Sequence, residues 1–205
     1  MDIKRKKMVV GLFFLAVLTV FIGCAARKPP AMTKVAGAAE TPPASKIKNI
    51  PAFELPVPQL EPEKNYLGVT GTGKFKLAEI KAPVLLIEIF SFYCPYCQQA
   101  APKVNELYQE IEKRPDLKDK VKLIGIGASN SLFEVNSFRE KYHVPFPLFA
   151  DQNMEIFKLL GARGTPTFVG LKLSDNASQE QFFFGEGAYH DTQKFLDEFI
   201  KLAGL

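Results

Sequence analysis

The hydrophobic and polar positions of this chain follow two alternating periods beyond residue 80. Residues 83–90 form an apolar run broken by one carboxylate, which is typical of a strand buried on both faces. Residues 95–113 place apolar side chains at the spacing of one helical face. The same reasoning predicts strands at 121–126, 146–150, 167–173 and 182–184, and helices at 131–143, 154–161 and from Asp191. Such alternation predicts an α/β domain with a central sheet flanked by helices, and we expect its last two strands to be antiparallel.

The first 24 residues have a different pattern, which predicts an export signal. Four basic residues, 4–7, precede sixteen uncharged residues, 8–23, and Cys24 follows at once. The apolar run is shorter than the roughly 20 residues that a membrane span needs. The string Phe21-Ile22-Gly23-Cys24 resembles a bacterial lipoprotein signal, in which the cysteine is lipidated, although that family usually has Leu where Phe21 stands. An uncleaved anchor and plain secretion remain open, and all three place the rest of the chain outside the cytoplasm.

Residues 24–50 predict a flexible tether and residues 51–205 a folded domain. The tether is rich in Ala, Pro, Lys and Thr and has too few large apolar residues to fold. The formal net charge of +4 divides into +3 for residues 1–23, +4 for residues 24–50 and −3 for residues 51–205. The basic character therefore belongs to the leader and the tether, so we expect no nucleic-acid partner. We expect the chain to meet the membrane through a lipid on Cys24.

The two remaining cysteines, Cys94 and Cys97, follow a predicted buried strand and begin a predicted helix. The amino end of a helix offers free N–H groups and about half a positive charge, which lowers the pKa of a thiol there. Two intervening residues allow the second thiol to form a disulfide with the first. A zinc site lacks further ligands, because His143 and His190 show no metal-ligand spacing. This pattern predicts a redox-active pair, with no metal and no cofactor beyond that disulfide.

The segment around these cysteines resembles the active-site region of the thioredoxin superfamily. Glu88 stands six residues before Cys94, and Pro102 stands five residues after Cys97, both at positions that the family uses. Residues 164–168, Gly-Thr-Pro-Thr-Phe, resemble the family's cis-proline loop. The 69 positions from Cys97 to Pro166 and the lead-in at 53–81 are similar to the TlpA/ResA group of membrane-tethered thioredoxins. The string from Glu88 to Cys97 is also similar to DsbA-type oxidases.

The resemblance implies a three-layer thioredoxin-like fold and a role for each site residue. Cys94 would form a mixed disulfide with an exported protein, and Cys97 would resolve it. Glu88 lies in an apolar strand, so we expect a raised pKa that suits proton transfer with Cys97. A buried carboxylate satisfied by a hydrogen bond is the structural alternative. The residues expected to contact the client or to tune the site are Tyr93, Pro95, Tyr96, Thr165 and Pro166.

The predicted function is thiol–disulfide exchange on exported proteins in the bacterial cell envelope, with a membrane or periplasmic redox partner. We expect a reductase, as in cytochrome c maturation or thiol-redox maintenance. An oxidase or isomerase with the same site remains open, as does a metal- or client-binding protein without turnover. A peroxidase is disfavoured, because Ile87 stands where peroxiredoxins carry a proline, although Ser91 stands where they carry Thr.

Overall fold

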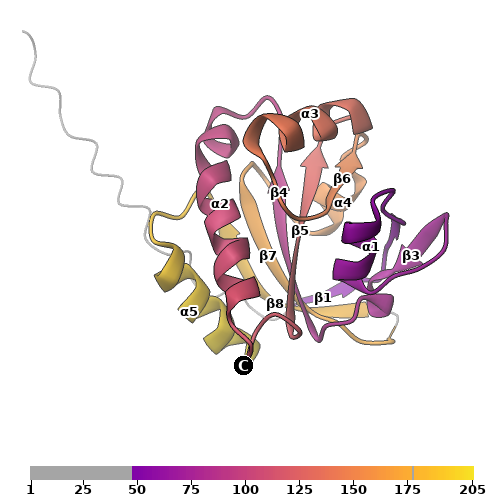
Figure 1. The fold of residues 1–205 in the computed structure, drawn as a ribbon, viewed down its shortest axis with the longest axis vertical. Helices are drawn as coiled ribbons and strands as arrows, with labels where there is room; N and C mark the ends of the chain where they lie inside the picture. The colour runs from indigo at the N-terminus through magenta and orange to yellow at the C-terminus, as the bar shows by residue number, and fades with distance from the viewer. Residues whose placement is uncertain (1–47, 177) are drawn as a thin grey trace, which may run out of the picture. The chain divides into compact units, whose positions relative to one another are not determined.

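The computed structural model describes residues 48–176 and 178–205 (Figure 1). The predicted signal, Cys24 and the tether up to residue 47 lie outside the described residues. The strands are β1 (Lys48–Pro51), β2 (Glu54–Pro56), β3 (Lys74–Lys76), β4 (Val84–Phe90), β5 (Val121–Ala128), β6 (Leu148–Asp151), β7 (Thr167–Lys172) and β8 (Ser178–Glu186). The helices are α1 (Glu61–Leu67), α2 (Pro95–Lys113), α3 (Leu132–Tyr142), α4 (Glu155–Leu159) and α5 (Thr192–Ala203), with a short 3-10 turn at Leu77–Glu79.

Six of these strands form one mixed sheet in the order β1-β8-β7-β4-β5-β6. The strands β4, β5 and β6 run parallel, whereas β7 is antiparallel to β4 and β8 is antiparallel to β7. The expected antiparallel pair near the C-terminus is therefore confirmed. The strands β2 and β3 form a separate two-stranded sheet. The predicted thioredoxin-like architecture, a mixed central sheet flanked by helices, is confirmed.

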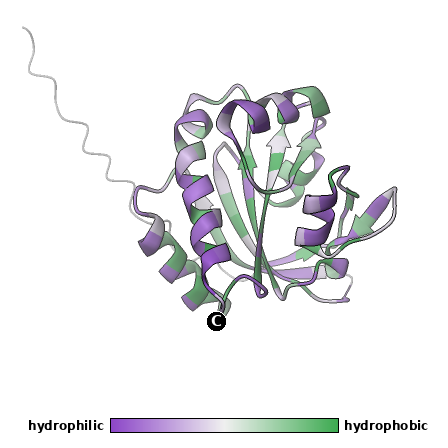
Figure 2. Cartoon of the chain, viewed as in Figure 1, coloured by the Kyte–Doolittle hydropathy of each residue, from purple (hydrophilic) through white to green (hydrophobic). Residues whose placement is uncertain are grey.

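The sheet separates two apolar cores, and β4 contributes alternate side chains to each. Leu86 and Phe90 join the core that α2, α3 and α5 cover. Leu85 and Ile87 join the core formed with α1, the end of α4 and the β2–β3 pair. Figure 2 shows green apolar segments along the strands, while the outward side of α2 is purple. Burial on both faces explains why β4 is apolar at every position except Glu88, because no face of this strand meets water.

The lead-in differs from the prediction of a tether over residues 24–50. Residues 48–50 belong to the folded domain, because β1 pairs with β8 and buries Ile50 completely. Gly68 ends α1 in a left-handed conformation (φ 73°), and along the chain α1 lies between β2 and β3.

None of the helices within residues 48–176 and 178–205 combines the length and the apolar character that crossing a bilayer requires.

Candidate active site

Cys94 is the residue that precedes the first turn of α2. Its backbone is extended (φ −81°, ψ 114°), and Pro95 occupies the first helical turn, where a missing N–H costs no hydrogen bond. The Cys94 amide donates to the carbonyl of Ser91 at 3.1 Å, and the Gln98 amide donates to the carbonyl of Cys94 at 3.1 Å. Cys94 is partly exposed, whereas Cys97 is completely buried, and neither forms a disulfide in this structure.

The surroundings of the two thiols shift their pKa values in opposite directions. Burial alone would raise the pKa of Cys94, but hydrogen bonds with Thr165, with Cys97 and with the backbone of Tyr96 outweigh it and lower this pKa. Burial raises the pKa of Cys97 well above its usual range, and the nearby Glu88 carboxyl adds to this rise. The exposed thiol is therefore the better nucleophile, and the buried thiol keeps its proton.

The loop before β7 lies against the cysteines. The peptide bond between Thr165 and Pro166 is cis, as the sequence predicted. The thiol of Cys94 donates to the carbonyl of Thr165 at 3.2 Å. The loop is fixed from both sides, because the Thr167 hydroxyl donates to the carbonyl of Gly164 at 2.8 Å and the Gly187 amide donates to the carbonyl of Pro166 at 2.8 Å.

Glu88 lies in β4 on the same side of the sheet as the buried cysteine. Its side chain is 2% exposed, and its Oε1 atom has no hydrogen-bond partner among the described residues. Burial, with a smaller contribution from Cys94, raises the pKa of Glu88 from 4.5 to about 8. The expected rise in this pKa is confirmed. This unpartnered oxygen argues against the structural alternative, in which a hydrogen bond satisfies the buried carboxylate.

The remaining residues predicted to contact a client are exposed around Cys94, namely Tyr93, Pro95 and Tyr96. Tyr93 is 65% exposed and Tyr96 69% exposed, which is unusual for aromatic side chains of this size. The Tyr93 hydroxyl donates to the carboxylate of Glu134 in the first turn of α3. The structure therefore gathers these residues with Cys94, Thr165 and Pro166, and their contact with a client stays a prediction.

Asn130, which the sequence reasoning missed, holds the segment that leads into Cys94. This residue is completely buried, and its Oδ1 atom accepts from the Phe92 amide at 2.8 Å. The carbonyl of the same Phe92 accepts from the Gln98 side chain at 2.8 Å. Both backbone polar groups of Phe92 are thus fixed, two residues before the nucleophile. A single Asn before a helix gives no signal of this contact, because its partner lies 38 residues earlier.

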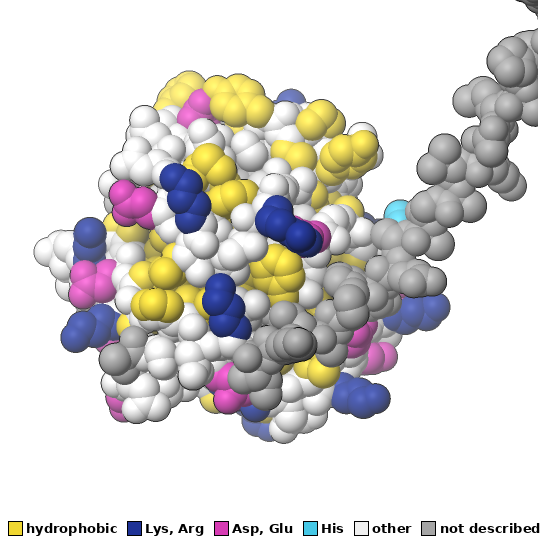
Figure 3. Space-filling model, turned by 180° about the vertical axis from the view of Figure 1, so that it is seen from behind, with side chains coloured by type: hydrophobic (Ala, Val, Ile, Leu, Met, Phe, Trp, Pro, Cys, Tyr) yellow, Lys and Arg dark blue, Asp and Glu magenta, His cyan; other side chains and the backbone are white. Residues whose placement is uncertain are grey.

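The exposed aromatic surface around Cys94 continues onto α3, which the sequence also did not predict. Leu132 is 53% exposed and Phe133 is 78% exposed, and both lie beside Glu134, the partner of Tyr93. Leu132 also lines a hollow of about 440 Å³ between α3, β6 and the connection from β2 to α1, and neither cysteine lines this hollow. On the face seen in Figure 3, basic and acidic side chains are intermixed rather than gathered by sign.

Comparisons with known proteins agree with this architecture. The sequence model described as the AhpC/TSA family matches residues 48–186. The thiol-disulfide oxidoreductase ResA of Bacillus thuringiensis subsp. konkukian is 28% identical over 129 residues, which cover 62% of this chain and 68% of the relative. ResA of Halalkalibacterium halodurans is 24% identical over 94 residues, covering 46% of this chain and 51% of that protein.

Two solved structures share the fold. A thiol:disulfide interchange protein DsbE from Chlorobium tepidum has a TM-score of 0.57 at 16% identity and covers 78% of this chain and 98% of its own. StoA from Bacillus subtilis has a TM-score of 0.52 at 16% identity and covers 72% of this chain and 95% of its own.

Proposed function

We propose, since this chain is a thiol–disulfide oxidoreductase of the AhpC/TSA family, that it reduces disulfides of exported proteins outside the cytoplasm. The observation that carries this proposal is the asymmetry of the cysteine pair. Cys94 is partly exposed with a lowered pKa, while Cys97 is buried with a raised pKa. An accessible nucleophile backed by a protected second thiol is the arrangement that two-step disulfide exchange requires.

The exchange proceeds in two displacement steps. The Cys94 thiolate attacks one sulfur of a client disulfide, a mixed disulfide forms, and the other client sulfur leaves as a thiolate. Cys97 then loses its proton to the ionised Glu88 and attacks the Cys94 sulfur, which releases the second client thiolate. The client gains two electrons and the pair ends as the Cys94–Cys97 disulfide. A membrane or periplasmic redox partner must then return two electrons to the pair.

The reducing direction is supported by the cysteine-to-proline spacing and the lead-in, which resemble the TlpA/ResA group of membrane-tethered thioredoxins. A strongly oxidising pair owes its potential to a stabilised thiolate and hence to a stabilised reduced form. Here the lowered pKa of Cys94 favours a thiolate and the raised pKa of Cys97 disfavours one, so the two shifts oppose each other. Cytochrome c maturation and the maintenance of exported thiols are the two roles that fit such a reductase.

The reduction potential of the Cys94–Cys97 couple tests the direction. Equilibration with glutathione buffers, followed by alkylation and mass spectrometry, should place the potential near that of thioredoxin, about −270 mV. A value near about −120 mV would instead identify a disulfide-forming oxidase. An isomerase would show the additional ability to rescue a scrambled client without net oxidation or reduction.

Trapping of mixed disulfides tests exchange against binding without turnover. With Cys97→Ser, a disulfide-bonded client should remain covalently attached to Cys94. The matched control, Cys94→Ser, keeps one thiol in the same site but should trap nothing, because Cys97 is buried. A protein that only holds a metal or a client through these cysteines would give no covalent adduct with either variant.

The envelope location rests on the leader sequence. Residues 1–23, Cys24 and the basic tether support a lipid anchor that holds the domain at the outer side of a membrane. Metabolic labelling with a radioactive fatty acid in a bacterial host should label the full chain. The Cys24→Ala variant should lose the label and leave the membrane fraction, whereas label retained by this variant would contradict the lipid assignment.

A further inference from the structure

Tyr189 lies in the connection between β8 and α5, outside every motif identified in the sequence. Its ring stacks on Phe195 with centroids 4.3 Å apart and meets Phe168 edge-on at 5.3 Å. Phe168 is the direct cross-strand partner of Glu88 in the β4–β7 register. Directly paired residues project from the same face of a sheet, so the Tyr189 ring contacts the side chain that stands beside Glu88.

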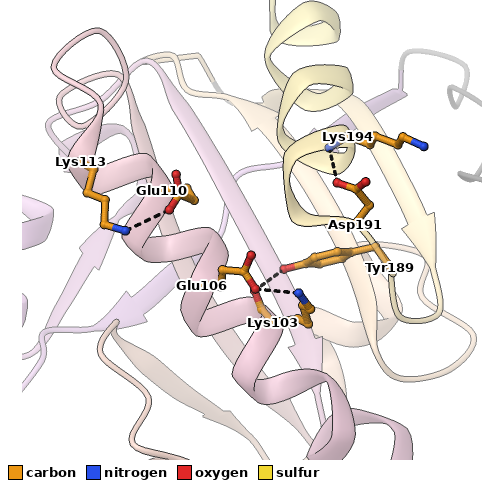
Figure 4. Close-up of polar contacts among 7 residues, drawn as sticks. All are labelled: Lys103, Glu106, Glu110, Lys113, Tyr189, Asp191 and Lys194. Carbon is orange, nitrogen blue, oxygen red and sulfur yellow. Dashed lines mark hydrogen bonds and ion pairs between the residues drawn. The ribbon is translucent and has the colours of Figure 1, made fainter.

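The hydroxyl of Tyr189 reaches across to α2. It donates to the carbonyl of Lys103 at 2.9 Å, in the turn that contains Pro102 (Figure 4). The ring is therefore held at three points, by two aromatic rings and by the α2 backbone. The connection that carries it is also tied to the active-site loop, since the Gly187 amide donates to the carbonyl of Pro166.

Two carboxyl groups, those of Glu88 and Glu106, lie near Tyr189. Burial raises the pKa of Tyr189 far above its usual range, and the carboxyls of Glu88 and Glu106 contribute to the rise. Glu106 itself is paired with Lys103 at 2.8 Å on the outer side of α2. Glu88 interacts in addition with both active-site thiols. The Tyr189 ring thus contacts the surroundings of Glu88, while its hydroxyl reaches the α2 backbone.

We propose that Tyr189 is a positioning residue of the thiol site, whose ring closes the α2–α5 side of the apolar surroundings of Glu88. Glu88 then exchanges protons only on the side of Cys94 and Cys97. This inference rests on the proposed role of Glu88 in exchange. Water that reached the carboxyl from the α2–α5 side would solvate its ionised form and provide a proton route that bypasses Cys97.

The test is an NMR titration of the Glu88 carboxyl in folded variants. Tyr189→Ala removes the ring and should increase the acid dissociation constant of Glu88 at least tenfold. Tyr189→Phe keeps the ring and should change this constant less than threefold. The control Tyr142→Ala truncates another tyrosine that packs on the same core, against Phe138, and should also change it less than threefold. If Tyr189→Ala does not fold, Tyr189→Leu replaces it with the same expectation.

Three results would overturn the inference. One is an unchanged Glu88 constant when the Tyr189 ring is removed, and another is an equal change in Tyr189→Phe, which would assign the effect to the hydroxyl. The third is an equal change in Tyr142→Ala. A failure of the proposed function would show in a different experiment. In that case Cys97→Ser would trap no client, whatever the titration of Glu88 shows.

Discussion

Glu88→Gln should change how the stability of this domain depends on pH. The variant keeps the size of the side chain but removes its proton equilibrium. A background with both Cys94→Ser and Cys97→Ser prevents the thiols from titrating in the same range. Because the folded protein holds the Glu88 proton more tightly than the unfolded chain, the free energy of unfolding of the parent should fall as pH rises between 4.5 and about 8.

The size of this effect follows from the two pKa values. Each pH unit between 4.5 in the unfolded chain and about 8 in the folded protein corresponds to about 1.4 kcal/mol. The parent should therefore lose up to about 5 kcal/mol of stability relative to Glu88→Gln between pH 4.5 and pH 8, since the Cys94→Ser background removes only the smaller contribution to this pKa. This is a large share of the roughly 5–15 kcal/mol that is typical for a domain.

Urea unfolding at a series of pH values measures this difference directly. Glu88→Leu is the matched control, since it also lacks the titrating group, and the gap between the Leu and Gln variants should not depend on pH. A gap between parent and Glu88→Gln that changes by less than about 1 kcal/mol over this range would refute the reasoning, because it would mean that the folded protein solvates the carboxylate as well as water does.

Three further outcomes follow from the site and the core. Iodoacetamide at pH 7 should modify Cys94 at least about tenfold faster than Cys97, as measured by peptide mass spectrometry, and equal rates would contradict the asymmetry of the pair. Asn130→Ala should cost about 1–3 kcal/mol in urea unfolding, because it leaves a backbone amide next to the nucleophile without its acceptor. Gly170→Ala should lower the free energy of unfolding by about 1–3 kcal/mol, because the added methyl group would lie 2.7 Å from the Phe199 ring. An unchanged urea midpoint would show that the ring can move aside.

Local sequence determined the elements whose residues interact with near neighbours. The apolar run of β4 and the helical spacing of α2 each reflect burial along one short segment. The cysteine motif at the start of α2 belongs to the same class, because a strand, a turn and a helix N-terminus follow one another directly. The fold class followed from these segments, since strands that alternate with helices have few ways to pack.

Long-range contacts decided the features that the sequence did not reveal. The strand β1 forms only because Ile50 pairs with β8, more than 120 residues later in the chain. The loop before Cys94 depends on Asn130. Neither residue carries a local pattern that announces its partner.

The proton chemistry of Glu88 shows both contributions in one residue. The apolar neighbours of Glu88 in the sequence were enough to predict that its pKa is raised, because burial penalises a charge in any fold. Which groups surround the carboxyl was decided by the tertiary structure alone. The register of β7 places Phe168 beside Glu88, and the connection after β8 brings Tyr189 onto that ring. A one-dimensional pattern records how apolar a segment is, but only chain packing determines which side of a buried group is closed to water.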